Sequence, residues 1–180
     1  APPQCHLWIV VWVCSSLTGS QFCSSGMDCN TINGIATCVD PCTNYTVLND
    51  AWRSVLNTDS SNLHCDNEIK RNTWHRMFLG ENNAQIPNTC VGQIFRCGTA
   101  APLWINGAHP TQADGIVSRP VCGYWSGSCC FYSSNPIKAK LCYGSYYVYK
   151  LDTASTCWLA YCTGTVIFQS IEGIVEMCFK

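Results

Sequence analysis

The sequence has 180 residues, a formal net charge of -1 and 12% charged residues, about half of the usual ~25%. It contains no basic or acidic run, which excludes an electrostatic surface for nucleic acid and a polybasic membrane patch. Its 16 cysteines indicate a disulfide scaffold formed in an oxidising compartment. We therefore expect a secreted, extracellular protein with a small, disulfide-rich fold.

The chain begins with a short apolar run followed by small polar residues, HLWIVVWVCSSLTGS (6–20). This pattern is typical of the end of a secretory signal peptide, so residues 1–20 are interpreted as a truncated signal. Cleavage near Ser20 would remove Cys5 and Cys14. A buried N-terminal strand is the alternative, and the run is too short to span a bilayer.

Residues 21–41 contain a predicted β-hairpin. Asn33-Gly34 suits the positive φ angles of a type I′ turn. Counting outward from this turn places Cys29 opposite Cys38 in a non-hydrogen-bonded pair, which predicts a disulfide between them. Cys23 and Cys178 are then left to pair with each other, to join two chains in a covalent dimer, or to remain free.

Residues 42–162 are predicted to form one unit, mainly β with long loops and one or two short helices, on which the hairpin packs. A helix of two turns at most is expected where apolar residues fall at helical spacing behind a possible Asn49 or Asp50 cap: Leu48, Trp52, Val55 and Leu56. Short strands are expected at 90–97, 115–125, 129–132 and 144–151, with turn-rich segments at 80–88, 106–115 and 133–136. Residues 163–180 form a C-terminal tail.

The unit holds ten cysteines, an even number that permits five disulfides: Cys42, Cys65, Cys90, Cys97, Cys122, Cys129, Cys130, Cys142, Cys157 and Cys162. Spacing does not decide the pairing. The neighbours Cys129 and Cys130 are expected to bond to different partners, because a bond between them would close a strained ring.

The sequence offers no catalytic, metal or cofactor motif, so we do not expect an enzyme. His64 beside Cys65 is interpreted as part of a disulfide segment, and Ser126 and Ser128 as turn residues. The aromatic strand YGSYYVYKL (143–151) could stack on sugars, but core packing is the favoured interpretation. Five tryptophans are likewise interpreted as core residues: Trp52, Trp74, Trp104, Trp125 and Trp158.

One segment carries the candidate functional site. Asn44-Tyr45-Thr46 is an N-glycosylation acceptor of the N-x-[ST] type, two residues after Cys42 on a connection expected to be exposed. Asn88-Thr89-Cys90 is only the rare cysteine variant of the motif. We therefore predict a glycan on Asn44, with simple solubilisation as the alternative use of that glycan.

From Cys42 to Thr163 the chain resembles the cysteine-rich module of the family of uromodulin and the pancreatic secretory granule membrane major glycoprotein. The resemblance is carried by DPCTNYTVLNDAWRS, CGTAAPLWINGAHP, DGIVSRPVCGYWSGSCCFY and YYVYKLDTASTCWLAYCT, and MDCNTINGIATCVDPC is similar to the family's β-hairpin. It implies a decoy module, in which a hairpin and a ten-cysteine domain present high-mannose N-glycans to mannose-binding adhesins of type 1 fimbriated bacteria.

The resemblance also implies where the glycan is carried. Asn44 matches a family acceptor, whereas Ala108 stands where the family commonly has Thr or Ser, so Asn106 is not an acceptor in this chain. The alternative is an extracellular protein-binding module on which the glycan is incidental.

Overall fold

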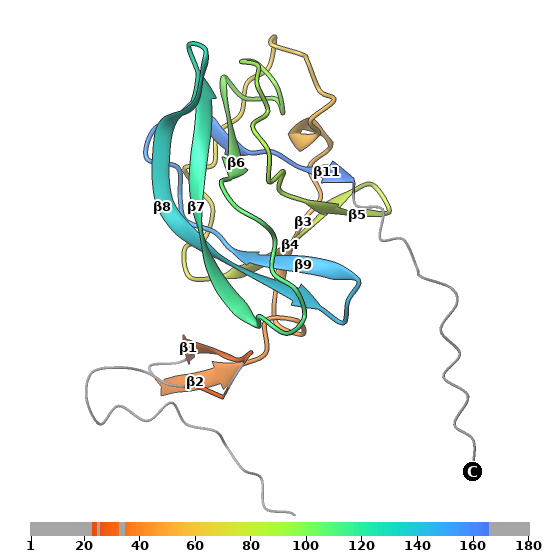
Figure 1. Cartoon of the computed structure of the whole chain (residues 1–180), viewed down its shortest axis with the longest axis vertical. Coiled ribbons are helices and arrows are strands. Elements are labelled where there is room, and N and C mark those ends of the chain that lie inside the picture. Colours follow the sequence, from red (N-terminus) through yellow and green to blue (C-terminus); the bar gives the residue numbers. More distant parts are fainter. Residues whose placement is uncertain (1–22, 25, 33–34, 166–180) are drawn as a thin grey trace, which may run out of the picture.

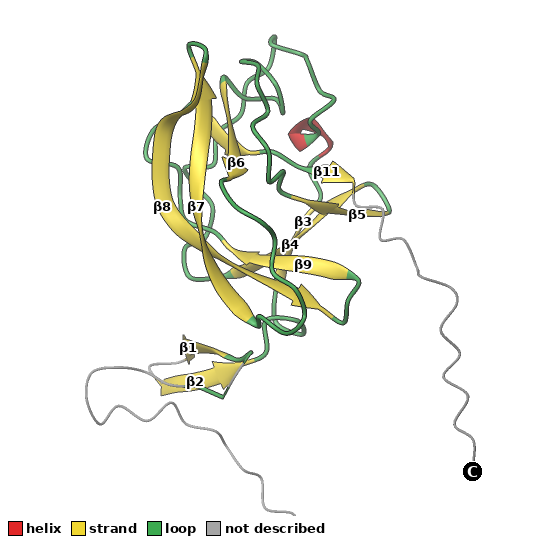
Figure 2. Ribbon diagram, viewed as in Figure 1, coloured by secondary structure: helices red, strands yellow, loops and turns green. Residues whose placement is uncertain are grey.

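The computed structural model describes residues 23–24, 26–32 and 35–165, and these residues are built mainly from β-strands and loops (Figures 1 and 2). The proposed signal segment, 1–20, and most of the proposed tail, 163–180, lie outside the described residues. The strands are β1 (Asp28–Ile32), β2 (Ile35–Val39), β3 (Thr46–Leu48), β4 (Trp74–Leu79), β5 (Asn82–Gln85), β6 (Ala101–Ile105), β7 (Ile116–Trp125), β8 (Ser128–Cys142), β9 (Tyr146–Lys150), β10 (Leu159–Tyr161) and β11 (Gly164–Thr165). The predicted small, mainly β, disulfide-rich fold is confirmed.

The first two strands form the predicted hairpin. β1 and β2 are antiparallel, and their register places Ile32 opposite Ile35 and Cys29 opposite Cys38. The predicted register is thus confirmed, while the turn residues 33–34 lie outside the described residues. The two strands form a separate ribbon at one end of the body (Figure 1).

The predicted Cys29–Cys38 disulfide is wrong. Cys38 is bonded to Cys23, with a Cα–Cα distance of 5.7 Å, and Cys29 is disulfide-bonded as well. Directly opposed residues of an antiparallel pair keep their Cβ atoms about 4.5–5.5 Å apart, longer than the ~3.8 Å of an unstrained disulfide. An interchain bond through Cys23 is excluded by the same pairing, and Cys178 lies outside the described residues.

The other strands form one nine-stranded sheet in the order β10-β6-β7-β8-β9-β4-β5-β11, with β3 paired to β4. The β7–β8 ribbon is long and curved (Figure 1). Pro120 and Pro136 lie where its register shifts, between the pairs Arg119–Ile137 and Val121–Ser134. Proline has no N–H to donate to a ladder, so a bulge is the place where a strand tolerates it.

One buried cluster fills the inside of this sheet, and its largest members are fully buried: Met77, Ile86, Leu103, Ile105, Ile137, Tyr149, Leu159 and Tyr161. A second, smaller cluster gathers Trp74, Tyr146 and Val148 around the disulfide between Cys42 and Cys142. The second cluster lies directly beneath the candidate acceptor segment that begins at Cys42.

The predicted helix is reduced to a single 3-10 turn, Ala51–Arg53. Asp50 makes no side-chain cap and instead accepts a hydrogen bond from Arg53 Nε at 2.9 Å. The Arg53 guanidinium is buried, with Nη1 and Nη2 each 2.7 Å from a carboxylate oxygen of Asp66. Leu56, expected on the apolar helix face, is 82% exposed. Tertiary ion pairing therefore overrides the helical spacing.

Three other segments differ from the sequence prediction. Residues 90–97 form no strand, because Gly92, Phe95 and Cys97 all have positive φ. Disulfides from Cys90 and Cys97 hold this loop at both ends. Strand β5 occupies part of the expected turn 80–88, and β8 continues through the expected turn 133–136. The remaining expected strands, 115–125 and 144–151, correspond to β7 and β9.

The ten cysteines of the body close on one another in five disulfides: Cys42–Cys142, Cys65–Cys157, Cys90–Cys129, Cys97–Cys162 and Cys122–Cys130. The adjacent pair Cys129 and Cys130 thus has different partners. Four of the five bridges join residues at least 39 positions apart, so reduction should remove a large restriction on the unfolded chain.

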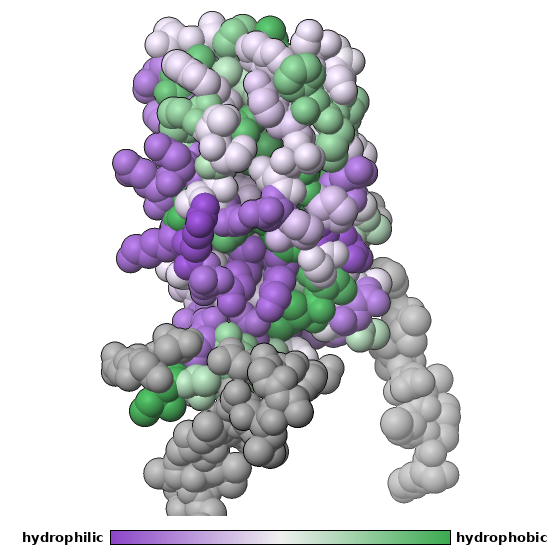
Figure 3. All heavy atoms as spheres, turned by 90° about the vertical axis from the view of Figure 1, so that its left-hand side faces the viewer, coloured by the Kyte–Doolittle hydropathy of each residue, from purple (hydrophilic) through white to green (hydrophobic). Residues whose placement is uncertain are grey.

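Charged side chains attach the hairpin to the body. Asp28 of β1 accepts hydrogen bonds from Trp74 Nε1 at 2.9 Å, Lys138 Nζ at 2.9 Å and Lys150 Nζ at 2.6 Å. Lys140 Nζ contacts the Gly26 carbonyl oxygen at 2.7 Å. Polar side chains form a band across this face in Figure 3, between the hairpin and an end where neutral and hydrophobic residues gather. The hairpin packs on the body through ion pairs.

Candidate glycosylation site

Asn44 lies in a tight turn between β2 and β3, and its residue is exposed. The turn is organised by Asp40, whose carbonyl oxygen accepts hydrogen bonds from the N–H groups of Thr43 at 3.1 Å and Asn44 at 3.0 Å. Asp40 Oδ1 also accepts from the Cys42 N–H at 2.9 Å. This side-chain turn fixes the local backbone without any help from the Asn44 side chain. The acceptor is therefore presented to solvent from an ordered stem.

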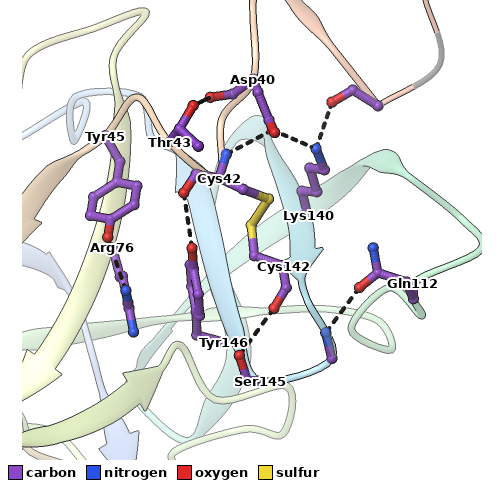
Figure 4. The surroundings of a disulfide bond; sticks show 12 residues. Asp40, Cys42, Thr43, Tyr45, Arg76, Gln112, Lys140, Cys142, Ser145 and Tyr146 are labelled. Atoms are coloured by element: carbon purple, nitrogen blue, oxygen red, sulfur yellow. Dashed lines mark hydrogen bonds and ion pairs between the residues drawn. A yellow bond between two sulfur atoms is a disulfide. The ribbon is translucent and has the colours of Figure 1, made fainter.

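A buried disulfide forms the base of the turn (Figure 4). Cys42 is bonded to Cys142 of β8, and both residues are buried. The Tyr146 hydroxyl donates to the Cys42 carbonyl oxygen at 2.9 Å, and burial raises the pKa of Tyr146, which keeps this donor protonated. Covalent and hydrogen-bonded attachments thus hold the chain two residues before Asn44.

A lysine links the same turn to the sheet and to the hairpin. Lys140 Nζ lies 2.8 Å from Asp40 Oδ1, on the carboxylate oxygen that also receives the Cys42 N–H. Burial alone would raise the pKa of Asp40, but the hydrogen bonds from Lys140 and from the Cys42 backbone outweigh it and lower this pKa. Asp40 is therefore a carboxylate at neutral pH, and its charge holds the turn against β8.

Aromatic rings and one arginine surround the turn on its other side. The Arg76 guanidinium lies 3.5 Å from the centroid of the Tyr146 ring and 5.6 Å from that of Tyr45. Its Nη1 donates to the Tyr45 hydroxyl at 2.9 Å, and its Nη2 donates to Asn83 Oδ1 at 2.7 Å. Tyr146 meets Tyr45 and Tyr143 edge-on, with centroid distances of 6.2 and 6.1 Å. These contacts fix the rings beside Asn44.

Sequence reasoning did not identify this cluster. Strand alternation places Tyr146 on one face of β9, but Arg76 belongs to β4 and Tyr45 to the turn, and only the sheet order brings them together. The parallel pairing of β3 with β4 carries Thr46 opposite His75, next to Arg76. No local sequence signal marks a parallel pairing between segments so far apart.

The other asparagines considered as acceptors lie elsewhere. Asn106 is exposed at the end of β6, and Ala108, also exposed, occupies the position that an N-x-[ST] motif would need for its hydroxyl. Asn88 is exposed too, but Cys90 of its motif is bonded to Cys129. Asn44 is thus the exposed asparagine, among the described residues, that carries an N-x-[ST] motif.

The remaining candidate residues have structural contacts. Cys65 is bonded to Cys157, and the His64 ring stacks on Trp52 at a centroid distance of 4.4 Å. Ser126 lies in the β7–β8 turn with φ of 50°. Tyr149 of the aromatic strand is fully buried, which agrees with core packing.

The tryptophans divide into two groups. Trp74 and Trp104 are buried and Trp52 and Trp125 are half-buried, whereas Trp158 is 60% exposed, contrary to the interpretation as a core residue. Its φ of 90° turns the chain just before β10 and leaves the indole at the surface.

Metal ligands and membrane-spanning helices are both absent from residues 23–24, 26–32 and 35–165. No group of three or more His, Cys, Asp or Glu side chains is arranged there to bind a metal ion. The same part of the chain has no helix long and apolar enough to cross a membrane.

The β architecture, the five disulfides of the body and the exposed acceptor motif define a disulfide-bonded extracellular glycoprotein domain. Residues 75–163 match the family model of the uromodulin-like cysteine-rich domain. The chain therefore belongs to the uromodulin-like family through this domain.

Two groups of curated relatives support the assignment. Rat uromodulin (Rattus norvegicus) is 41% identical over 170 residues, which covers 93% of this chain and 24% of that protein. The pancreatic secretory granule membrane major glycoprotein GP2 of mouse (Mus musculus) is 46% identical over 129 residues, covering 70% of this chain and 23% of the relative. The human GP2 (Homo sapiens) is 44% identical over 126 residues, with 70% and 22% covered. The chain thus spans about a quarter of the length of these relatives.

Proposed function

We propose that this chain presents an N-glycan of the high-mannose type on Asn44 to mannose-binding adhesins of type 1 fimbriated bacteria, and so acts as a decoy. The observation that supports this most directly is the exposed acceptor motif at Asn44, held two residues from the buried Cys42–Cys142 disulfide. In this role the polypeptide is a carrier and does not catalyse a reaction.

A rigid stem favours such a role on physical grounds. Ordering a flexible loop on binding would cost about 1–2 kcal/mol per residue, and the hydrogen bonds of Asp40 together with the disulfide remove most of that cost in advance. A single glycan contact is weak, with a dissociation constant of roughly micromolar order. Bacteria present many fimbriae, so several copies of the protein displayed together would bind with much higher avidity.

The test is an adhesion assay with matched variants. Wild-type protein and the Asn44→Gln variant are expressed in cells that make high-mannose glycans, immobilised, and exposed to type 1 fimbriated bacteria with and without free mannose. Thr46→Ala removes the acceptor motif while keeping Asn44, and Asn106→Gln is the control, since Asn106 is exposed but lies outside any motif. Binding should be lost in the first two variants, kept in the control, and abolished by mannose or by endoglycosidase.

Equal binding of all variants, or a failure of mannose to compete, would refute the decoy function. It would favour the second candidate, an extracellular protein-binding module. That candidate is supported by exposed hydrophobic side chains outside the acceptor segment, with Ile94, Phe131 and Trp158 each at least 40% exposed.

A further inference from the structure

One turn beside the acceptor carries a residue that its backbone does not favour. Residues Cys142 to Ser145 form the turn between β8 and β9, closed by a hydrogen bond from the Ser145 N–H to the Cys142 carbonyl oxygen at 2.9 Å. Its two central residues, Tyr143 and Gly144, have φ of 52° and 64°. Glycine or asparagine is the usual choice at such positions, and a bulky side chain there is strained. Turn chemistry therefore does not explain Tyr143.

The Tyr143 side chain is also poorly buried. It is 65% exposed, although a phenol ring is a large apolar group. The Gly144 N–H donates to Gln112 Oε1 at 3.0 Å, so the turn is held in place and the ring projects from a fixed backbone. A strained backbone position that displays an exposed aromatic ring indicates a use for that ring outside the fold.

Tyr143 belongs to a surface that we call the tyrosine surface, formed by Tyr45, Tyr143 and Tyr146. Tyr146 lies between the other two rings, with centroid distances of 6.2 Å to Tyr45 and 6.1 Å to Tyr143. Arg76 fixes the orientation of Tyr45 and Tyr146 from behind, through its hydrogen bond to the Tyr45 hydroxyl and its position over the Tyr146 ring. The rings are thus ordered before any ligand arrives.

The tyrosine surface begins at the residue that follows the acceptor. Asn44 directly precedes Tyr45, and the Cys42 carbonyl oxygen, two residues earlier, is hydrogen-bonded to Tyr146. A sugar attached to Asn44 is therefore delivered to these rings covalently, at a high effective concentration, so that weak contacts suffice. Pyranose rings have apolar C–H faces that pack on aromatic rings, and their hydroxyls can hydrogen-bond to the phenol groups.

We propose that the tyrosine surface holds the first N-acetylglucosamine residues of the Asn44 glycan against the protein and thereby shields the adjacent mannose residues from the glycosidases that remove them by hydrolysis. The inference rests on the proposed glycosylation of Asn44. It assigns to Tyr143, at the edge of the surface, the role of keeping the glycan in its mannose-rich form.

The test measures trimming of the native glycoprotein. Wild type and Tyr143→Asn are produced in cells that cannot process high-mannose glycans, purified in folded form, and treated with α-mannosidase while glycopeptide mass spectrometry follows Asn44. Asparagine suits a positive φ, so this variant should fold at least as stably as wild type. Trimming should be about fivefold faster in the variant, which corresponds to ~1 kcal/mol of lost packing.

Two controls make the result specific. Phe131→Ser removes another ring, 54% exposed and far along β8 from the turn, and should not change the rate. Reduced, unfolded wild type should be trimmed as fast as the unfolded variant. Equal rates for folded wild type and Tyr143→Asn would overturn this inference alone, because an occupied Asn44 leaves the proposed function standing. An Asn44 without a glycan would overturn both.

Discussion

The attachment of the hairpin should depend on one carboxylate, Asp28. Its side chain is 6% exposed and accepts hydrogen bonds from Lys150, which is 12% exposed, from Lys138, which is 47% exposed, and from Trp74. Substituting Asp28→Asn removes the negative charge but keeps the size of the side chain. The change leaves the ammonium of Lys150 partly buried without its counterion, a situation that is strongly unfavourable.

The magnitude follows from these contacts. A hydrogen bond to a charged group contributes about 1.5–3 kcal/mol, and removing one partner of a buried pair costs about 3–5 kcal/mol. The half-exposed Lys138 adds little, because solvent screens it. We therefore expect Asp28→Asn to destabilise docking of the hairpin by about 3–5 kcal/mol, which corresponds to ~100- to 1000-fold faster hydrogen exchange through local opening.

The assay is hydrogen exchange of folded, disulfide-intact protein, followed by mass spectrometry of β1–β2 and of β7–β8. Exchange should accelerate in the hairpin strands and stay unchanged in the long ribbon. The exposed Asp59, whose carboxylate contacts only nearby Ser61, provides the matched control Asp59→Asn. If hairpin exchange in Asp28→Asn equals that of wild type, charge is not what attaches the hairpin.

The same carboxylate sets a pH limit on docking. Burial by itself would raise the pKa of Asp28, but the hydrogen bonds from Lys150, Lys138 and Trp74 outweigh it and lower the pKa. A lowered pKa in the folded state means that the stabilisation is complete above the unfolded value of about 3.9 and is lost as the pH falls through the folded value. Hairpin protection, corrected for the intrinsic exchange rate, should therefore persist to about pH 4 and disappear below it.

Three further predictions address other parts of the structure. Ala108→Thr should create an acceptor at the exposed Asn106 and add one N-glycan, visible as a mass increase; a secreted variant of unchanged mass would contradict this. Asp66→Asn should lower the free energy of unfolding by about 3–5 kcal/mol in denaturant titrations, because it leaves the buried Arg53 without its partner; a loss below ~1 kcal/mol would speak against it. Burial, assisted by the charge of a neighbouring arginine, lowers the pKa of His109 to about 4, so the free energy of unfolding should fall as the pH drops from about 6.5 to 4, and His109→Gln should flatten that part of the curve unless another group causes it.

Local signals in the sequence predicted the parts of the fold that local signals control. The Asn33-Gly34 pair fixes the register of the hairpin, and that register is found in the structure. The disulfide was misassigned because opposition in register and bonding distance are separate conditions, and Cys23 satisfies the second for Cys38. A rule that counts along two strands cannot include a cysteine that precedes both of them.

Long-range contacts explain the other differences. Leu48 and Leu56 have helical spacing, but the segment between them is held by the ion pair of Arg53 with Asp66, and the sequence does not show that these two side chains meet. The same limit applies to the acceptor site. The motif at Asn44 is readable directly, whereas the ring of Tyr143 becomes part of its surroundings only through the order β8-β9-β4 in the sheet.

The contacts of Asp40 connect glycan presentation to the hairpin. Asp40 ends the segment that leads from β2, orders the turn that carries Asn44, and pairs with Lys140 of β8. Lys140 in turn binds the Gly26 carbonyl oxygen, just before β1. Any loosening of the hairpin is therefore transmitted to the stem of the acceptor through shared hydrogen bonds. This coupling gives the hairpin a physical role in a glycan-presenting module, because a sugar on a fixed stem keeps one orientation while many weak contacts with an adhesin-bearing surface accumulate.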